Sequence, residues 1–188
     1  MHEHHHVAAD QLEFGVEAIK RSPATTGVLR LIVCRPDVGA RETMSEARLD
    51  EVAGLIGDSW LKRGSSRTPD RSANPDAQIT VMNARAIALV AASRARWPLA
   101  GDQLFVDLDL STVNLPTGSR LRVGEAVIEI STEPHTGCYK FKDRFGAAAL
   151  AWVNSPVGRE LNLRGVNARI VTGGIVRVGD PVVKLCDD

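Results

Sequence analysis

The sequence predicts a mainly β, barrel-like fold with a few helices, and three observations support this prediction. Short segments typical of strands recur through the second half of the chain, glycine-containing turns separate them, and only one or two segments have helical spacing. Many short strands with few helices favour a barrel or sandwich over a parallel α/β sheet. The expected strands are residues 104–106, 120–123, 126–132, 168–172, 175–178 and 182–185.

Length and composition restrict the class of protein. The chain has 188 residues, 44% hydrophobic and 24% charged, as in an ordinary soluble globular protein of one domain. Its 23 Lys plus Arg balance 23 Asp plus Glu, which argues against a general binder of nucleic acid or of anionic membranes. Three cysteines cannot all pair, and no apolar leader or spanning segment is visible, so we expect a cytoplasmic protein.

The N-terminal part reads as an extension, residues 1–26, before a barrel domain at residues 27–188. Apolar residues at helical spacing predict a short helix that ends before Pro23. Alternation at residues 28–34 then predicts a strand that is buried on both faces. Histidines gather at the start of the chain, where a metal-binding tract, an expression tag and a native tail all remain open. They are His2, His4, His5 and His6.

The middle of the chain contains a long polar loop and the best helix signal. Residues 62–76 are predicted to be a loop, in which Arg67 and Arg71 stand four apart among hydroxyl side chains. Such a set suits a phosphate group, although a solvated surface loop is the alternative. A strand at 78–82 is expected to lead through Asn83, as N-cap, into a helix at 84–97 that Pro98 ends.

Three further local signals concern residues 44–52, the turn at Gly124 and the strand that begins near Pro181. Helix propensity would permit a helix at residues 44–52. Gly124 and Glu125 fit a two-residue hairpin turn with positive φ at the glycine. Pro181 is expected to open the last strand, because proline is tolerated at a first or edge position.

The segment EPHTGCYKFKDRFG, residues 133–146, carries the most chemistry. Turn residues precede Cys138, and an extended 138–142 would place Cys138, Lys140 and Lys142 on one face. Nearby cations favour the thiolate, which acts as a nucleophile or soft-metal ligand. The alternative is that Cys138 is a small buried hydrophobe. His135 is poorly placed as a general base for this thiol, although it could tune it.

Several segments together resemble the MOSC domain family, which also forms the C-terminal part of molybdenum cofactor sulfurases. The segments are GLIGD at 54–58, QITVM at 78–82, LPTGSRLRVGEAVIEIS at 115–131, PHTGCYKF at 134–141 and RGVNARIVTGGIVRVGD at 164–180. The resemblance implies a barrel like that of pyruvate kinase and a molybdopterin-type cofactor. It also implies that Cys138 is the catalytic sulfur carrier or the molybdenum ligand. Candidate cofactor-binding residues are Arg67, Arg71, His135, Thr136, Lys140 and Arg144.

The sequence departs from the family pattern at two places, and the resemblance leaves two other functions open. Trp60 stands near the position of a histidine often found after Gly-Asp, and residues 102–104 read Asp-Gln-Leu where many members have Glu-Asn-Leu. We expect a stand-alone MOSC protein that binds the cofactor, carries sulfur, or does both, with a cysteine desulfurase or electron-transfer protein as partner. The alternatives are a reductase of N-hydroxylated compounds that draws electrons from another chain, and a non-enzymatic binding module.

Overall fold

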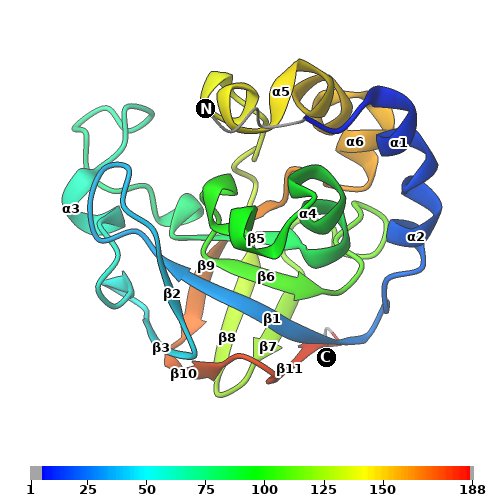
Figure 1. Cartoon of the computed structure of the whole chain (residues 1–188). Helices are drawn as coiled ribbons and strands as arrows, with labels where there is room; N and C mark the ends of the chain where they lie inside the picture. Colours follow the sequence, from blue (N-terminus) through cyan, green and yellow to red (C-terminus); the bar gives the residue numbers. More distant parts are fainter. Residues whose placement is uncertain (1–5, 187–188) are drawn as a thin grey trace.

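The computed structural model describes residues 6–186, and within them seven strands close into a barrel (Figure 1). Neighbouring barrel strands are antiparallel except for one parallel pair, β5 with β6, and the barrel closes where β1 pairs with β11. In order around the barrel, the strands are β11 (Pro181–Lys184), β7 (Arg120–Val123), β8 (Ala126–Ile130), β9 (Val166–Thr172), β5 (Ile79–Asn83), β6 (Leu104–Asp107) and β1 (Thr26–Cys34). The predicted mainly β barrel is confirmed.

The turn signals that join these strands are also confirmed. Gly124 adopts φ +54° in the β7–β8 hairpin, and Pro181 is the first residue of β11. Of the N-terminal histidine tract, His2, His4 and His5 fall outside the described residues.

A second, smaller sheet occupies the place where a helix at residues 44–52 was permitted by propensity. Strand β2 (Glu42–Met44) pairs with β1, and β3 (Glu46–Asp50) lies between β10 (Gly174–Arg177) and β4 (Gly54–Leu55). In β3, Ala47 and Leu49 are buried while their neighbours face outward. This period-two burial against β10 overrides the local helix propensity, so the helix prediction is wrong.

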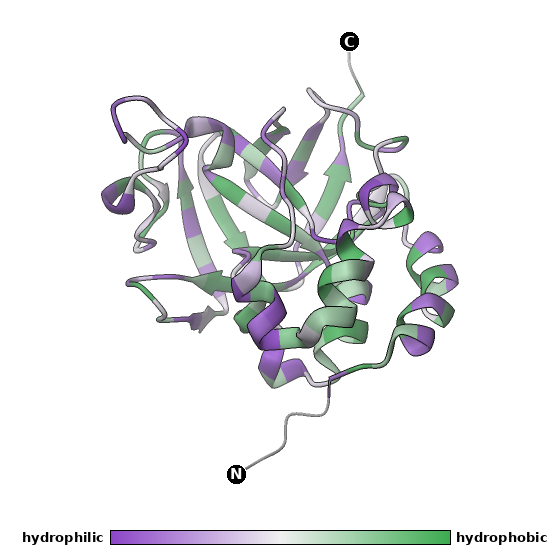
Figure 2. Ribbon diagram, turned by 90° about the horizontal axis from the view of Figure 1, so that it is seen from above, coloured by the Kyte–Doolittle hydropathy of each residue, from purple (hydrophilic) through white to green (hydrophobic). Residues whose placement is uncertain are grey.

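Five helices gather beside the barrel and cover one part of its outer surface: α1 (Ala9–Phe14), α2 (Val16–Lys20), α4 (Ala84–Ala91), α5 (Tyr139–Asn154) and α6 (Pro156–Glu160) (Figure 1). Helix α3 (Trp60–Arg63) lies apart from them on the side of β2 (Figure 1). Figure 2 shows a largely apolar helix over the barrel, with more hydrophilic residues on the outer helices. Among the described residues, no helix is long and apolar enough to cross a membrane. The 3₁₀ helices are η1 (Pro75–Ala77) and η2 (Arg94–Ala100).

Two apolar cores flank the barrel wall. The core inside the barrel and the small sheet contains only aliphatic residues and Cys34, whereas the core between barrel and helices contains the buried aromatic residues other than Trp60. In β6, Leu104 and Val106 face the first core and Phe105 faces the second. A strand in such a wall is buried on both faces, which explains the apolar run 31–34 at the end of β1, after the exposed Arg30.

The helix after β5 is shorter than its sequence predicts. Asn83 is confirmed as the N-cap, since its Oδ1 accepts hydrogen bonds from the backbone N–H groups of Arg85 and Ala86. However, α4 ends at Ala91 because Ala92 adopts a left-handed φ of +57°. Pro98 lies inside the following 3₁₀ helix rather than ending α4, so the predicted extent of 84–97 is wrong.

We predict that Asn83→Ala lowers the free energy of unfolding by about 2–3 kcal/mol. The substitution removes the cap of α4 and two donations from the Asn83 amide, to Ser22 Oγ at 2.9 Å and to the Leu108 carbonyl at 2.8 Å. Urea denaturation measures the loss. Ser93→Ala is the control, because the Ser93 hydroxyl makes no cap hydrogen bond at η2. Equal stability losses in the two variants would contradict the assignment.

Candidate functional site

The turn at residues 99–102, which includes the end of η2 and precedes β6, accepts hydrogen bonds from three arginines of distant segments. Each of three successive carbonyl groups takes one guanidinium, and the carbonyls at the end of a helix otherwise lack partners. The pairs are Arg144 Nη1 with Leu99, Arg164 Nη2 with Ala100 at 3.0 Å, and Arg35 Nη1 with Gly101 at 3.1 Å. The turn therefore gathers cationic side chains from β1, α5 and the segment before β9.

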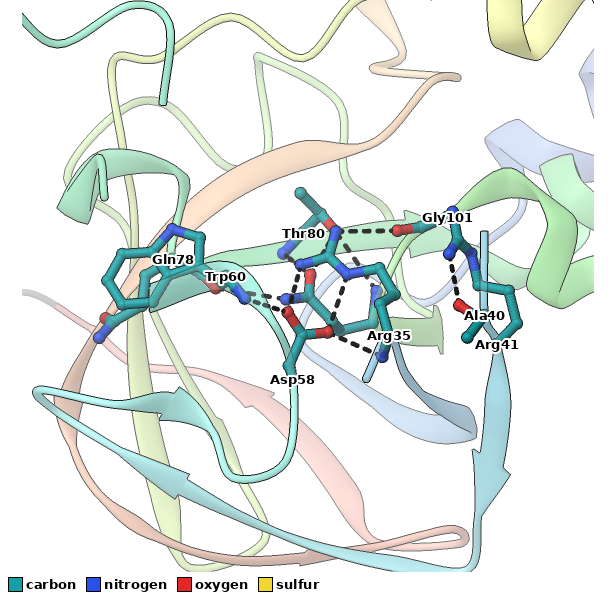
Figure 3. Close-up of polar contacts among 9 residues, drawn as sticks. Arg35, Ala40, Arg41, Asp58, Trp60, Gln78, Thr80 and Gly101 are labelled. Carbon is teal, nitrogen blue, oxygen red and sulfur yellow. Dashed lines mark hydrogen bonds and ion pairs between the residues drawn. The ribbon is translucent and has the colours of Figure 1, made fainter. Parts of the chain in front are cut away.

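Arg35 is held on its other side by Asp58 (Figure 3). The Asp58 carboxylate accepts from Arg35 Nε at 2.8 Å and Nη2 at 3.0 Å, and from the Trp60 backbone N–H at 2.9 Å. The Asp58 side chain is fully buried, so this bidentate pair is shielded from solvent. The Gly-Asp motif thus fixes the arginine at the end of β1.

Asp102 forms a second buried ion pair, with Arg164, and orients His135. Its Oδ2 accepts from Arg164 Nη1 at 2.6 Å, and its Oδ1 lies 2.7 Å from His135 Nε2. Burial opposes ionisation of Asp102, but Arg164 and His135 outweigh it and lower its pKa to about 2. Burial and the charge of Arg164 lower the pKa of His135. The neutral ring therefore donates from Nε2 to the carboxylate, which leaves Nδ1 as an acceptor.

The first cavity at this site, called the arginine cavity here, has a volume of about 460 Å³. Arg35, Arg63 and Arg67 line it together with His135 and Thr136. These residues come from the end of β1, α3, the loop after α3 and the segment before α5. Arg67 forms an ion pair with Glu133, whereas Arg63 forms no ion pair within residues 6–186.

A smaller basic cavity of about 330 Å³ adjoins it, and Arg63 lines both. Arg41, Lys140 and Arg144 also line it, together with the carboxylates Asp37 and Asp143, so its cations outnumber its anions by four to two. A Cβ atom built on Gly101, where φ is +90°, would lie 3.4 Å from Arg41 Nη2 and 3.9 Å from Arg144 Nη1, so the two guanidinium groups converge there. Burial, followed by repulsion from the nearby arginines, lowers the pKa of Arg41. Such unneutralised, partly buried charge favours the binding of an anion.

The structure distributes the predicted cofactor-binding residues over both cavities. Arg67, His135 and Thr136 line the arginine cavity, and Lys140 and Arg144 line the smaller one. Arg71 lines neither. It adopts φ +61°, and its backbone N–H and carbonyl close the loop through Thr68 and Ser65.

Sequence reasoning missed Arg35 and Arg63. Arg35 directly follows the strongest predicted strand, and Gly57 with Asp58 supplies its partner, so this pairing was the available signal. Arg63 stood among other loop cations with nothing to distinguish it.

The segment around Cys138 is helical, so the expected extended strand at 138–142 is wrong. Cys138 is the N-cap residue of α5, and its carbonyl accepts from the backbone N–H groups of Phe141 and Lys142. Phe141 and Phe145, four apart, are buried with ring centroids 4.9 Å apart, and this contact selects the helix. Cys138, Lys140 and Lys142 therefore do not share one face.

The three thiols differ in accessibility. Cys138 is exposed rather than a buried hydrophobe, and it lies between residues that line the two basic cavities. Cys34 is buried in β1, as expected from its apolar strand, and Cys186 is exposed near the C-terminus. Within residues 6–186, no three His, Cys, Asp or Glu side chains group as metal ligands.

We predict that Asp102 contributes to the pH dependence of stability at acid pH. A carboxyl whose pKa is lowered by folding, here from 3.8 to about 2, stabilises the protein above its ordinary pKa and loses that contribution as the pH falls. The free energy of unfolding should fall by about 2 kcal/mol through this group between roughly pH 5 and pH 2. Urea denaturation across this range should show a flatter profile for Asp102→Asn.

Asp143→Asn is the matched control, because Asp143 is exposed and forms no ion pair within the described chain. Its profile should follow that of the unsubstituted protein. Parallel acid profiles for Asp102→Asn and the unsubstituted protein would contradict the role given to the Asp102 ion pair.

Comparison with solved structures identifies proteins of the same fold. The YuaD protein from Bacillus subtilis aligns with a TM-score of 0.62 at 18% identity, over 86% of this chain and 97% of that one. YiiM from Escherichia coli aligns with a TM-score of 0.55 at 21% identity, over 86% and 71% of the two chains. YiiM from Geobacillus stearothermophilus gives 0.52 at 12% identity, over 87% and 74%.

Among the curated proteins, none matches this sequence significantly. A family model does match, and it covers most of the barrel, the later part of the loop after α3, from Thr68 on, and the whole of α5. The model is that of the MOSC domain, it aligns with residues 68–183, more than half of the chain, and the protein therefore belongs to the MOSC domain family.

Proposed function

We propose that this protein binds a molybdopterin-type cofactor in the arginine cavity, and that Cys138 is its sulfur carrier or molybdenum ligand. One observation carries the proposal: Arg35, from the end of β1, and Arg63 and Arg67, from α3 and the loop directly after it, line one cavity beside His135. Membership of a domain family related to the molybdenum cofactor supports it. Cys138, which lies between residues that line the two basic cavities, supplies the thiol.

The residues present fit the chemistry of such a cofactor, which combines a phosphate group with a pterin ring. Guanidinium groups bind phosphate through paired N–H donors, and Arg63 and Arg41 form no ion pair within residues 6–186. Arg41 lines the smaller cavity, and its Nε is buried without a hydrogen-bond partner among the described residues. Thr136 and Asn167 add a hydroxyl and an amide for the polar edge of a heterocycle.

Each part of the site has a role in this proposal. Arg63 and Arg67 would hold the anionic group, with Arg35 fixed behind them by Asp58. Lys140 and Arg144 would extend the positive potential into the smaller cavity. When bound, the cofactor would supply a molybdenum centre with affinity for sulfur donors. The exposed thiol of Cys138 is accessible to such a centre or to a partner protein.

Sulfur loading needs a partner that presents a persulfide, such as a cysteine desulfurase. The Cys138 thiolate would attack the outer sulfur of the donor persulfide, so that a new S–S bond forms on Cys138 while the donor S–S bond breaks. The donor leaves as its thiolate, and the proton of the persulfide remains with the transferred sulfur or the solvent. No external oxidant or reductant is required.

We predict that the protein purified from a molybdate-supplied host contains molybdenum and a pterin. Elemental analysis and the fluorescence of the oxidised pterin measure both. Arg63→Gln should lower the bound cofactor at least about tenfold, since one lost charged hydrogen bond costs roughly 1.5–3 kcal/mol. Arg71→Gln is the control, because Arg71 lines neither basic cavity.

Absence of both molybdenum and pterin, with no persulfide on Cys138 by mass spectrometry, would refute the proposal. Equal losses in the Arg63 and Arg71 variants would refute the assignment of the phosphate to the arginine cavity.

We predict that Cys138 is alkylated at least about tenfold faster than Cys34 at pH 7. Cys138 is exposed, whereas Cys34 is only 3% exposed and its pKa is raised by burial and then by Asp58 and Glu42. Iodoacetamide labelling followed by site-resolved mass spectrometry measures both rates. The exposed Cys186 provides a reference for an accessible thiol. A Cys138 rate equal to that of Cys34 would remove the reactive thiol from the proposal.

A further inference from the structure

A third cavity of about 420 Å³ lies on the other side of the segment that leads to Cys138, and it is called the neutral cavity here. It shares Glu133, Pro134, His135 and Asn167 with the arginine cavity, so one strip of chain separates the two. Its volume is in the range of small-molecule sites. The rest of its lining is uncharged and combines aliphatic with hydroxyl and amide side chains. Representative residues are Leu115, Thr117, Ile130, Thr132, Asn162 and Val166.

Glu133, the one carboxylate of this lining, is already neutralised. Its Oε1 pairs with Arg67, and its Oε2 accepts a hydrogen bond from Asn74 Nδ2 at 3.1 Å. Both partners belong to the side of the arginine cavity. The neutral cavity therefore offers no free charge to a ligand from the described residues. A charged ligand would lose hydration there without gaining an ionic partner.

His135 lines both cavities, and one nitrogen of its ring is free to form a hydrogen bond. Its Nε2 is bound to the fully buried carboxylate of Asp102. A Cβ built on Gly165 would lie 3.2 Å from His135 Cδ2, so that edge of the ring packs on Gly165. The opposite edge carries Nδ1, which bonds to no described residue and is not among the buried unpartnered atoms. Nδ1 is therefore a solvent-accessible acceptor.

We propose that the neutral cavity binds an uncharged small molecule whose N–H or O–H group donates to His135 Nδ1. The aliphatic residues would take its apolar part, and the hydroxyl and amide side chains would take further polar atoms. This molecule would lie beside the cofactor, so the cavity defines the substrate class. The inference that this molecule is a substrate rests on the proposed function, whereas the inference that the neutral cavity binds it does not.

Three probes of one size and shape test this proposal on the full chain: benzamide, benzoate and benzamidine. Only benzamide is both uncharged and an N–H donor. We expect benzamide to bind at least about tenfold more tightly than either ion, since an unpaired charge in such a site costs more than 1.4 kcal/mol. Protein NMR should place its largest shift changes at residues 115–117, 130–132 and 162–166. In ¹⁵N-histidine spectra, His135 Nδ1 should shift more than Nε2.

Thr117→Trp would fill the mouth of the neutral cavity and should abolish benzamide binding. Thr117→Val is the matched control, because it keeps the shape and Thr117 makes no hydrogen bond within the described residues. Equal benzamide binding by Thr117→Trp, benzamide shift changes elsewhere, or tighter binding of benzoate with its shift changes at residues 115–117, 130–132 and 162–166 would overturn the proposal, whereas benzoate bound in the arginine cavity would not.

Pyrophosphate binding to the arginine cavity, measured by calorimetry, separates the two proposals. It should be unchanged in Thr117→Trp and weakened in Arg63→Gln. Benzamide binding in a protein that fails to bind pyrophosphate would support the neutral cavity and contradict the cofactor site.

Discussion

The organisation of this protein depends on one set of hydrogen bonds, from three arginines to the carbonyls of residues 99–101. Arg144, Arg164 and Arg35 come from segments far apart in the chain, and each donates to a different carbonyl of the same turn. The turn ends η2, so its carbonyls need donors. Guanidinium groups satisfy this need and are in turn held in fixed positions. Asp102 follows directly and pairs with Arg164.

This arrangement concentrates positive charge with few compensating carboxylates. Three of the arginines form ion pairs. Arg35 pairs with Asp58 and Arg164 pairs with Asp102, and both of these pairs are buried. Arg67 pairs with Glu133. Arg41 and Arg63 have no such partner within residues 6–186. Their mutual repulsion costs stability, which an anionic ligand would restore. The Asp102 carboxylate, which stabilises the charge of Arg164, also orients His135. One side chain therefore contributes both to the stability of the fold and to the geometry of the site.

The two cores explain how a barrel of aliphatic strands carries this site at one side. The inner core keeps the barrel closed, and the aromatic residues outside it hold the helices. Phe141 and Phe145 anchor the first turns of α5 in the outer core, and Arg164 stacks over the Phe141 ring at 5.0 Å. Cys138 therefore stands at the exposed start of a helix whose first part, before the break at Gly146, is anchored by these two rings.

The sequence by itself determined the strands of the barrel, several turns and one cap, because period-two alternation, Gly124 and Asn83 act over a few residues, but it did not determine strands β2, β3 and β4. It also offered Arg67, His135 and Thr136 as candidate cofactor-binding residues, and all three line the arginine cavity. Tertiary structure alone decided that a helix follows Cys138. The local sequence fits both conformations, because the alternation CYKFK favours a strand and the spacing of Phe141 and Phe145 favours a helix. Only the outer core, which buries both phenylalanines, selects the helix. It also decided that Arg35, Arg41 and Arg63 converge, because contacts across the barrel set their distances.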